Sequence, residues 1–262
     1  MKLTKMLRLL LFLMVFLPFS GCRKTPPQPL YPPNTKIISP TDYDTLTNAQ
    51  VLCEWEGLEN AVEYQYKLDS LNWSDWINNT KETFFLDEGM HIFTVTSRNE
   101  FNREDPSPAI VNFYVDAITG PALWLKKREM EVDVLQASSL KVFVEDITNL
   151  MLANLELLYD NSKLKIENVL SDSSFLAKNG GQIQMISEFS DSLPEIKINI
   201  GITGGTPGGV SGSGPLVKLL FFLKSADTTE ITFSSSSELR DTLNSSITLT
   251  GGLFSCKVIP KQ

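Results

Sequence analysis

The chain has 262 residues, 42% of them hydrophobic, and a formal net charge of -8. This length accommodates about two domains of ordinary size, each with an apolar core. An acidic chain offers no basic face to phosphate groups, so the composition excludes nucleic acid as an expected partner.

Residues 1–21 have the pattern of a secretory leader. Lys2, Lys5 and Arg8 precede an almost unbroken apolar run from Leu9 to Phe19. A run of about eleven residues is too short for a bilayer, which needs roughly 20 residues at about 1.5 Å each. The pattern therefore predicts a signal peptide.

The leader ends in Ser20-Gly21-Cys22, with two small residues before a cysteine. This motif resembles a bacterial lipoprotein processing site, which implies cleavage before Cys22 and acylation of its thiol. Two or more acyl chains make membrane attachment durable. The resemblance implies a lipid bilayer as partner and an extracytoplasmic location at the outer membrane or cell surface. The alternative is an ordinary cleaved leader in which Cys22 has no role.

Residues 22–35 predict a linker. Five prolines fall in this segment, at positions 26, 27, 29, 32 and 33. Proline fixes φ and lacks the amide donor, so neither a helix nor an interior strand is expected. We expect an extended spacer that lifts the first domain off the lipid surface.

The sequence of residues 36–117 predicts short strands of alternating polarity, separated by turns. Val51, Cys53 and Trp55 share one parity, and Leu52 and Glu54 share the other. Successive side chains of a strand point to opposite faces, so the first three residues are expected in a core. The spacing of such runs predicts a β-sandwich.

Trp55, the run Tyr64-Gln65-Tyr66 and the corner at residues 86–89 resemble a fibronectin type III or immunoglobulin-like module. The resemblance implies the fold and nothing more. Trp73 and Trp76 lie in a loop between the expected strands. They either present indoles to a sugar or, as is commoner in such modules, pack over the sheet edge.

Residues 121–260 predict a second all-β domain, a jelly-roll sandwich of nine strands. The expected strands cover 122–125, 140–144, 153–159, 163–169, 182–188, 195–202, 216–223, 230–233 and 253–259. Leu155, Leu157 and Ile198 are expected in its core, with Glu156 and Lys197 on the opposite face.

Two motifs in this second segment resemble a cohesin module. They are the strand 155–160, which ends in Tyr-Asp, and Gly212-Ser213-Gly214 before the apolar run 216–222. Cohesins are bacterial scaffold domains, and the resemblance implies that a dockerin or another protein binds the flat outer face of one sheet. By strand parity that face includes Glu156, Gln184, Glu188, Lys197 and Asn199. The alternative is that these are ordinary solvated positions.

Two further functions stay open from the sequence. Some polysaccharide-binding modules share the jelly roll, but they need a planar row of exposed aromatic rings, and Trp124 is the one tryptophan of the second domain. A passive stalk is the third hypothesis. The chain has no Asp-x-Asp-x-Asp-Gly loop of the dockerin type, so a cellulosome role is not implied.

Catalysis, cofactors and metal ions are not expected. His91 is the only histidine and has no neighbouring cysteine or histidine to complete a metal site. No nucleophile has a base in view, although a carboxylate pair among 31 acidic residues stays open. Cys53 and Cys256 alternate with apolar residues in different domains, so both are expected as buried free thiols.

Overall fold

The computed structural model describes residues 31–58, 60–204 and 208–261. These residues are nearly all β, with a single four-residue α-helix, α2 (Ser173–Leu176), and a short 3-10 turn, η1 (Ala177–Asn179). The predicted all-β class is confirmed. In this part of the chain no helix is long and apolar enough to cross a membrane. Cys22 and the predicted signal peptide lie outside the described residues.

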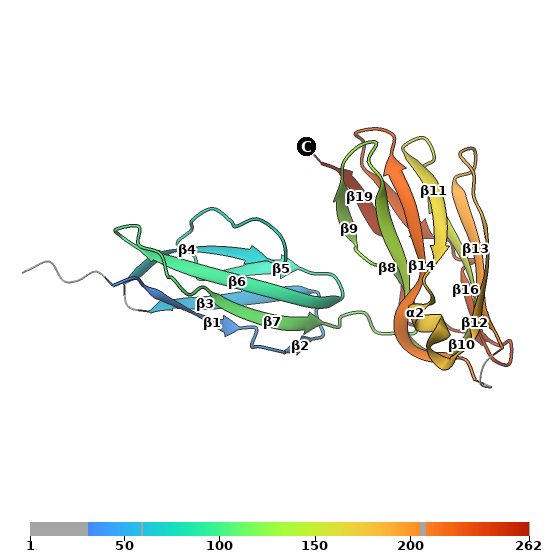
Figure 1. Cartoon of the computed structure of the whole chain (residues 1–262), viewed down its shortest axis with the longest axis horizontal. Helices are drawn as coiled ribbons and strands as arrows, with labels where there is room; N and C mark the ends of the chain where they lie inside the picture. Colours follow the sequence, from blue (N-terminus) through green and yellow to red (C-terminus); the bar gives the residue numbers. More distant parts are fainter. Residues whose placement is uncertain (1–30, 59, 205–207, 262) are drawn as a thin grey trace, which may run out of the picture.

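The first seven strands form two sheets that enclose one core, and we call this unit the N-terminal sandwich (Figure 1). One sheet has the order β1-β3-β5 and the other β2-β7-β6-β4. The strands are β1 (Asn34–Ser39), β2 (Thr45–Leu46), β3 (Gln50–Leu58), β4 (Ala61–Leu68), β5 (Lys81–Phe85), β6 (Gly89–Asn99) and β7 (Ala109–Val115).

Aromatic rings fill the core of the N-terminal sandwich. Val51, Cys53 and Trp55 are buried, as their alternation on β3 predicts, while Leu52 is exposed. The Trp55 ring lies 5.7 Å from the ring of Phe93 on the opposite sheet. Large rings let two short sheets share one compact core.

The remaining twelve strands form the C-terminal sandwich. They are β8 (Ala122–Leu125), β9 (Glu129–Val132), β10 (Ser138–Tyr159), β11 (Leu164–Ser171), β12 (Gln182–Glu188), β13 (Glu195–Thr203), β14 (Val210–Leu223), β15 (Thr229–Phe233), β16 (Glu238–Asp241), β17 (Ser246–Ile247), β18 (Gly252–Phe254) and β19 (Cys256–Pro260). The expected nine strands become twelve. The predicted strands 140–144 and 153–159 join into β10, the predicted run 253–259 divides into β18 and β19, and the short strands β9, β16 and β17 lacked a distinct pattern.

The 22-residue strand β10 belongs to both layers of this sandwich. Its first part pairs with β8 and β14, and its second part with β13, β15 and β16. Asp146 and Asn149 have positive φ, and the pairing with β14 shifts register there. This bend carries the strand between layers. The sequence predicted two separate strands at this point, because polar residues interrupt the apolar alternation.

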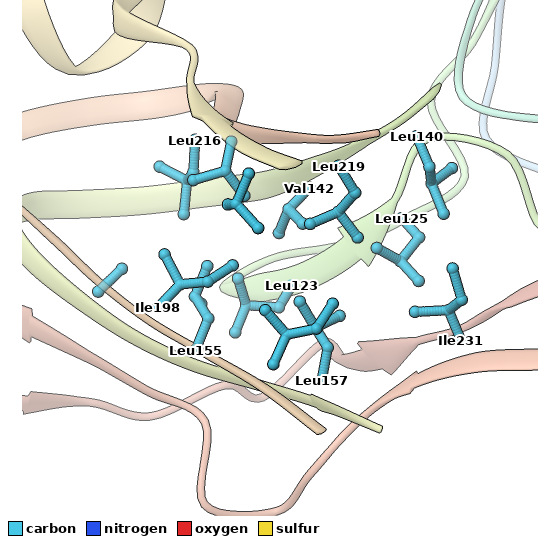
Figure 2. Packing of buried hydrophobic residues seen from close by; sticks show 14 of the residues in the cluster. Leu123, Leu125, Leu140, Val142, Leu155, Leu157, Ile198, Leu216, Leu219 and Ile231 are labelled. Carbon is cyan, nitrogen blue, oxygen red and sulfur yellow. The ribbon is translucent and has the colours of Figure 1, made fainter. Parts of the chain in front are cut away.

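The core between the two layers is mainly aliphatic, with Phe221 and a few other rings among its members (Figure 2). Leu155, Leu157 and Ile198 face Val142 and Leu219 of the other layer, and all five are buried. The predicted inner face of these strands is therefore confirmed. A glycine also shapes this unit, because a Cβ on Gly214 would lie 2.5 Å from the ring of Phe175, which α2 packs against β14.

The turn between β5 and β6 contacts the segment between β7 and β8, which connects the two sandwiches. Glu88 accepts hydrogen bonds from the amides of Ala117 and Ile118 in the connecting segment, at 2.9 and 2.8 Å. The Asp87 carboxylate accepts from the backbone amide of Arg128 at 2.9 Å. These contacts restrict the linker, while independent folding of the predicted domains 36–117 and 121–260 stays a prediction.

Candidate functional site

The outer face of strands β12, β13, β10 and β16 is the candidate site, and we call it the outer face. Strand register brings all five predicted residues together on it. Glu156 pairs with Lys197, whose other neighbour is Glu188, while Gln184 pairs with Gly201, two residues beyond Asn199. The neighbouring positions on β10 and β13 point into the core, so these side chains contribute little to packing.

A row of charges crosses the middle of the outer face, in the order Glu188, Lys197, Glu156. The Lys197 ammonium also forms an ion pair with Glu195 at 2.9 Å. Its hydrogen bond with Glu195, and then the charges of Glu195, Glu156 and Glu188, raise the pKa of Lys197 above its ordinary value. Lys197 therefore stays charged at neutral pH and presents a cation between carboxylates.

Three amide side chains surround this row, and the structure gives none of them a hydrogen-bond partner within its described residues. They belong to Asn154, Gln184 and Asn199. Asn154 and Asn199 are direct cross-strand neighbours and line a hollow of about 150 Å³ beside Glu156. Each amide has both donors and acceptors, so the hollow offers unsatisfied hydrogen-bonding groups to a bound molecule.

A serine-rich turn fixes Glu156 at one side of this hollow. The Ser236 hydroxyl donates to the Glu156 carboxylate at 2.5 Å, and the Glu156 amide donates to the Ser237 hydroxyl at 3.0 Å. These bonds hold the carboxylate in one place before any partner arrives. Such preorganisation reduces the entropy lost on binding.

One end of the outer face is apolar. Leu152 and Ile186 line a hollow of about 290 Å³, and 68% of Ile186 is exposed. Gly201 forms part of its floor, and an added Cβ there would lie 3.2 Å from Leu152 Cδ1. The missing side chain keeps the hollow open.

A larger hollow of about 800 Å³ lies at the other end. Leu158 and Thr232 are cross-strand neighbours on its floor, and Glu230 and Lys257 form a second pair beside them. Three hollows therefore lie along β10. The outer face holds an apolar one beside Ile186 and a polar one beside Asn154, and the third lies where this face meets β15 and β19, with Leu158 beside Glu230 and Lys257.

The apolar residues of the outer face were not predicted from the sequence. Ile186 and Leu158 have the same parity as the predicted polar residues, so alternation alone pointed to them. Outward residues were predicted from their polar character, and this character does not identify an outward leucine or isoleucine. Strand parity was the more general signal.

The loop tryptophans of the N-terminal sandwich pack over a sheet edge. Ser74 donates to the Tyr66 carbonyl of β4, and Gln65 donates to the Ser74 carbonyl. Lys67 lies over the ring of Trp73 and Arg98 over that of Trp76, at 5.0 and 4.4 Å. A cation thus already occupies one face of each ring.

His91 is a buried structural residue. Its Nδ1 lies 2.9 Å from an Asp69 carboxylate oxygen and its Nε2 lies 2.9 Å from the Asp87 carbonyl oxygen. Both neighbours are acceptors, so both ring nitrogens must donate and the imidazole carries a proton on each. Burial lowers the pKa of His91, but the bonds and charges of Asp69 and Asp87 outweigh it and raise that pKa overall.

The two described cysteines are free and buried, as predicted. Burial raises the pKa of both the Cys53 and the Cys256 thiol to about 12. Thiols in this state are poor nucleophiles. Among the described residues, no three histidine, cysteine, aspartate or glutamate side chains gather in a way that could hold a metal ion.

The described residues are thus nearly all β, and one sheet has an exposed outer face with hollows on it. No protein-family model matches the sequence. No curated protein matches it either.

Solved structures similar to this chain include several cohesins. The sixth cohesin of Acetivibrio cellulolyticus scaffoldin B, solved with a dockerin, is 18% identical over 55% of this chain and 100% of its own, with a TM-score of 0.44. A non-cellulosomal cohesin from Archaeoglobus fulgidus is 19% identical over 53% and 90%, with a TM-score of 0.41. A type I cohesin from Pseudobacteroides cellulosolvens is 12% identical over 53% and 91%, with a TM-score of 0.40.

Proposed function

We propose that this chain is a membrane-anchored lipoprotein that binds a protein partner through the outer face of its C-terminal sandwich. The observation that carries the binding proposal is the combination of two hollows and three amides without a hydrogen-bond partner among the described residues on one sheet face, with a third hollow at its edge. Each part of that combination has a separate role in recognition.

The apolar ends of the outer face supply the free energy of binding. Burying Ile186 and Leu158 under a partner removes apolar surface from water, at roughly 25 cal/mol per Å². The polar middle supplies specificity. A partner that leaves the Asn154 or Asn199 amide buried without a hydrogen bond loses about 1–3 kcal/mol per group.

The partner class is a protein, and a dockerin is the first candidate. The cohesin resemblance of residues 155–160 and 212–222 supports this choice. Polysaccharide binding has less support, because Trp124 is buried and its ring packs 4.7 Å from Phe143. Strands β12, β13 and β16 contain no aromatic residue, and Tyr159 of β10 is buried.

The anchor is proposed at Cys22, which begins the mature chain in this account. The support is the leader, the small residues before Cys22 and the spacing of both. Mass spectrometry of the mature N-terminus tests it directly. A diacylated or triacylated Cys22 peptide is the expected result, and an unmodified N-terminus at another residue overturns the anchor.

Two matched variants test the binding proposal, and each replaces one exposed aliphatic residue with lysine. Ile186→Lys puts a charge in the apolar hollow of the outer face, and Leu170→Lys puts one on exposed β11 in the other layer. A panel of dockerins and extracytoplasmic proteins is tested against immobilised wild type and both variants, with insoluble polysaccharide as a second arm. We expect Ile186→Lys alone to lose protein capture. Equal capture by both variants, or capture of polysaccharide only, contradicts the proposal.

A further inference from the structure

The end of the N-terminal sandwich where the described chain begins is a distinct tip. Strand β1 starts beside Leu58, the last residue of β3, and Ala61 of β4 pairs with Asn99 of β6. The Asn99 side chain donates to the Tyr31 carbonyl at 3.4 Å. Figure 1 shows that this end lies away from the C-terminal sandwich.

Large apolar side chains are exposed together at this tip. They come from the entering chain, the β3 end, the β4 start and the loop after β6, with exposed fractions of 65% for Tyr31, 41% for Leu58, 43% for Val62 and 53% for Phe101. The loop is held in place, because the Phe101 amide donates to the Asn99 side chain at 2.9 Å. Charged Glu100 precedes Phe101 in the sequence. A gathering of exposed apolar residues commonly marks a contact surface.

The chain length before the tip limits what can cover it. Cys22 and Tyr31 are nine positions apart. A chain reaches at most about 3.6 Å per residue, so the tip lies within roughly 30 Å of Cys22. If Cys22 carries lipid, the tip is the first folded part of the molecule that the bilayer meets.

We propose that this tip rests on the lipid bilayer, with Phe101, Tyr31 and Leu58 in the headgroup layer. The inference rests on the proposed lipid anchor. Tyrosine and other amphipathic side chains favour this layer, where the ring is shielded and polar groups stay hydrated. The tether keeps the tip near the bilayer, so weak contacts suffice because the effective concentration is high. The contact orients the N-terminal sandwich end-on and directs the C-terminal sandwich away from the membrane.

The test places a polarity-sensitive fluorophore at the tip. Glu100→Cys supplies an exposed thiol next to Phe101, while the buried thiols of Cys53 and Cys256 have pKa values of about 12 and do not compete. Thr242→Cys, on the exposed turn between β16 and β17, is the control position. The full-length mature protein is reconstituted in phosphatidylcholine vesicles.

Two ways of attaching the protein to the vesicle are compared, so that the tip contact and the lipid anchor are tested separately. One is the native lipid on Cys22, and the other is an N-terminal hexahistidine tag at the same position, bound to a nickel-chelating lipid. We expect a blue shift of the Glu100→Cys fluorophore with both tethers and none for Thr242→Cys. The shift should be lost in the Leu58→Ser, Phe101→Ser variant.

The matched variant Met90→Ser, Ile92→Ser removes exposed apolar residues from the side of the same sandwich and should keep the blue shift. Absence of the shift with both tethers overturns the tip contact, and so does a shift that survives Leu58→Ser, Phe101→Ser. Absence of lipid on Cys22 overturns the anchor alone, because the hexahistidine tether still reports on the tip.

Discussion

The two sandwiches of this chain use different means of stabilisation. Rings such as Trp55 and Phe93 fill the small N-terminal core, and a half-buried ion pair between His91 and Asp69 links its turns. Branched aliphatic side chains fill the larger C-terminal core, where β10 takes part in both layers. Because of this difference, we expect the stability of the N-terminal sandwich to depend on pH and on single rings. We expect substitutions on the outer face to leave the stability of the C-terminal sandwich nearly unchanged, because Glu156, Lys197 and Asn199 lie outside its core.

The largest expected effect is on the N-terminal core. Trp55→Ala removes a fully buried ring, and we expect a loss of about 3–5 kcal/mol in the free energy of unfolding of that sandwich. Trp55→Phe is the matched control. The Trp55 indole N–H has no hydrogen-bond partner among the described residues, so phenylalanine leaves no polar group unsatisfied.

Chemical denaturation followed by separate probes in each sandwich measures this effect. If Trp55→Ala also lowers the transition of the C-terminal sandwich by the same amount, the two units unfold together and the comparison between them fails.

The second effect concerns the aliphatic core. Leu157→Ala or Ile198→Ala leaves a cavity between the layers, and we expect a loss of about 2–5 kcal/mol in the free energy of unfolding. The transition of the N-terminal sandwich should stay unchanged. A loss below about 0.5 kcal/mol, the range typical of exposed positions, would show that these side chains do not face the core.

A smaller effect should follow pH in the N-terminal sandwich alone. The pKa of His91 is raised in the folded state, so its stabilising contribution is complete below the unfolded pKa, about 6.5, and is lost as pH rises through the raised value. The groups facing the imidazole are the Asp69 carboxylate, the Asp87 carbonyl and the Phe113 ring, with Lys127 acting on Asp69.

The contribution of Asp69 to stability has the opposite dependence on pH. Burial raises its pKa, but hydrogen bonds to His91 and Ile92 outweigh this and lower it overall, so its contribution is lost as pH falls through that lowered value. Because the chain has one histidine, its NMR ring signal reports the His91 pKa directly. Unfolding curves of wild type and His91→Gln should converge above that pKa, and parallel curves at every pH contradict the pairing.

Much of the fold could be predicted from the alternation of apolar and polar residues, because this signal lies within each strand. The side of a strand is fixed by parity, so the buried Trp55, Leu157 and Ile198 and the outward Glu156 and Lys197 follow from the sequence alone. The bend of β10 at Asp146 and Asn149 could not be predicted in this way. Its positive φ values depend on pairing with β14, more than 60 residues away.

The candidate site was predicted in its polar part only. Parity identified Lys197 and Asn199 as outward residues. The hollow beside Gly201, however, depends on how Leu152 and Ile186 are placed relative to each other across three paired strands. Such a cavity arises from long-range packing, which a pattern along one strand does not contain. The short strands β9 and β16 were missed because four residues carry too little alternation.

The smallest effect on stability is expected for substitutions on the outer face, and these also test whether this face binds the partner. The triple variant Glu156→Ala, Lys197→Ala, Asn199→Ala changes only the polar middle of the outer face, and one sample of it is used for both unfolding and partner capture. We predict a free energy of unfolding within about 0.5 kcal/mol of wild type, as for exposed substitutions, together with loss of protein capture through faster dissociation. Unchanged capture with unchanged stability would contradict the claim that this face binds the partner, and a collapse of stability would contradict the separation of core and binding face.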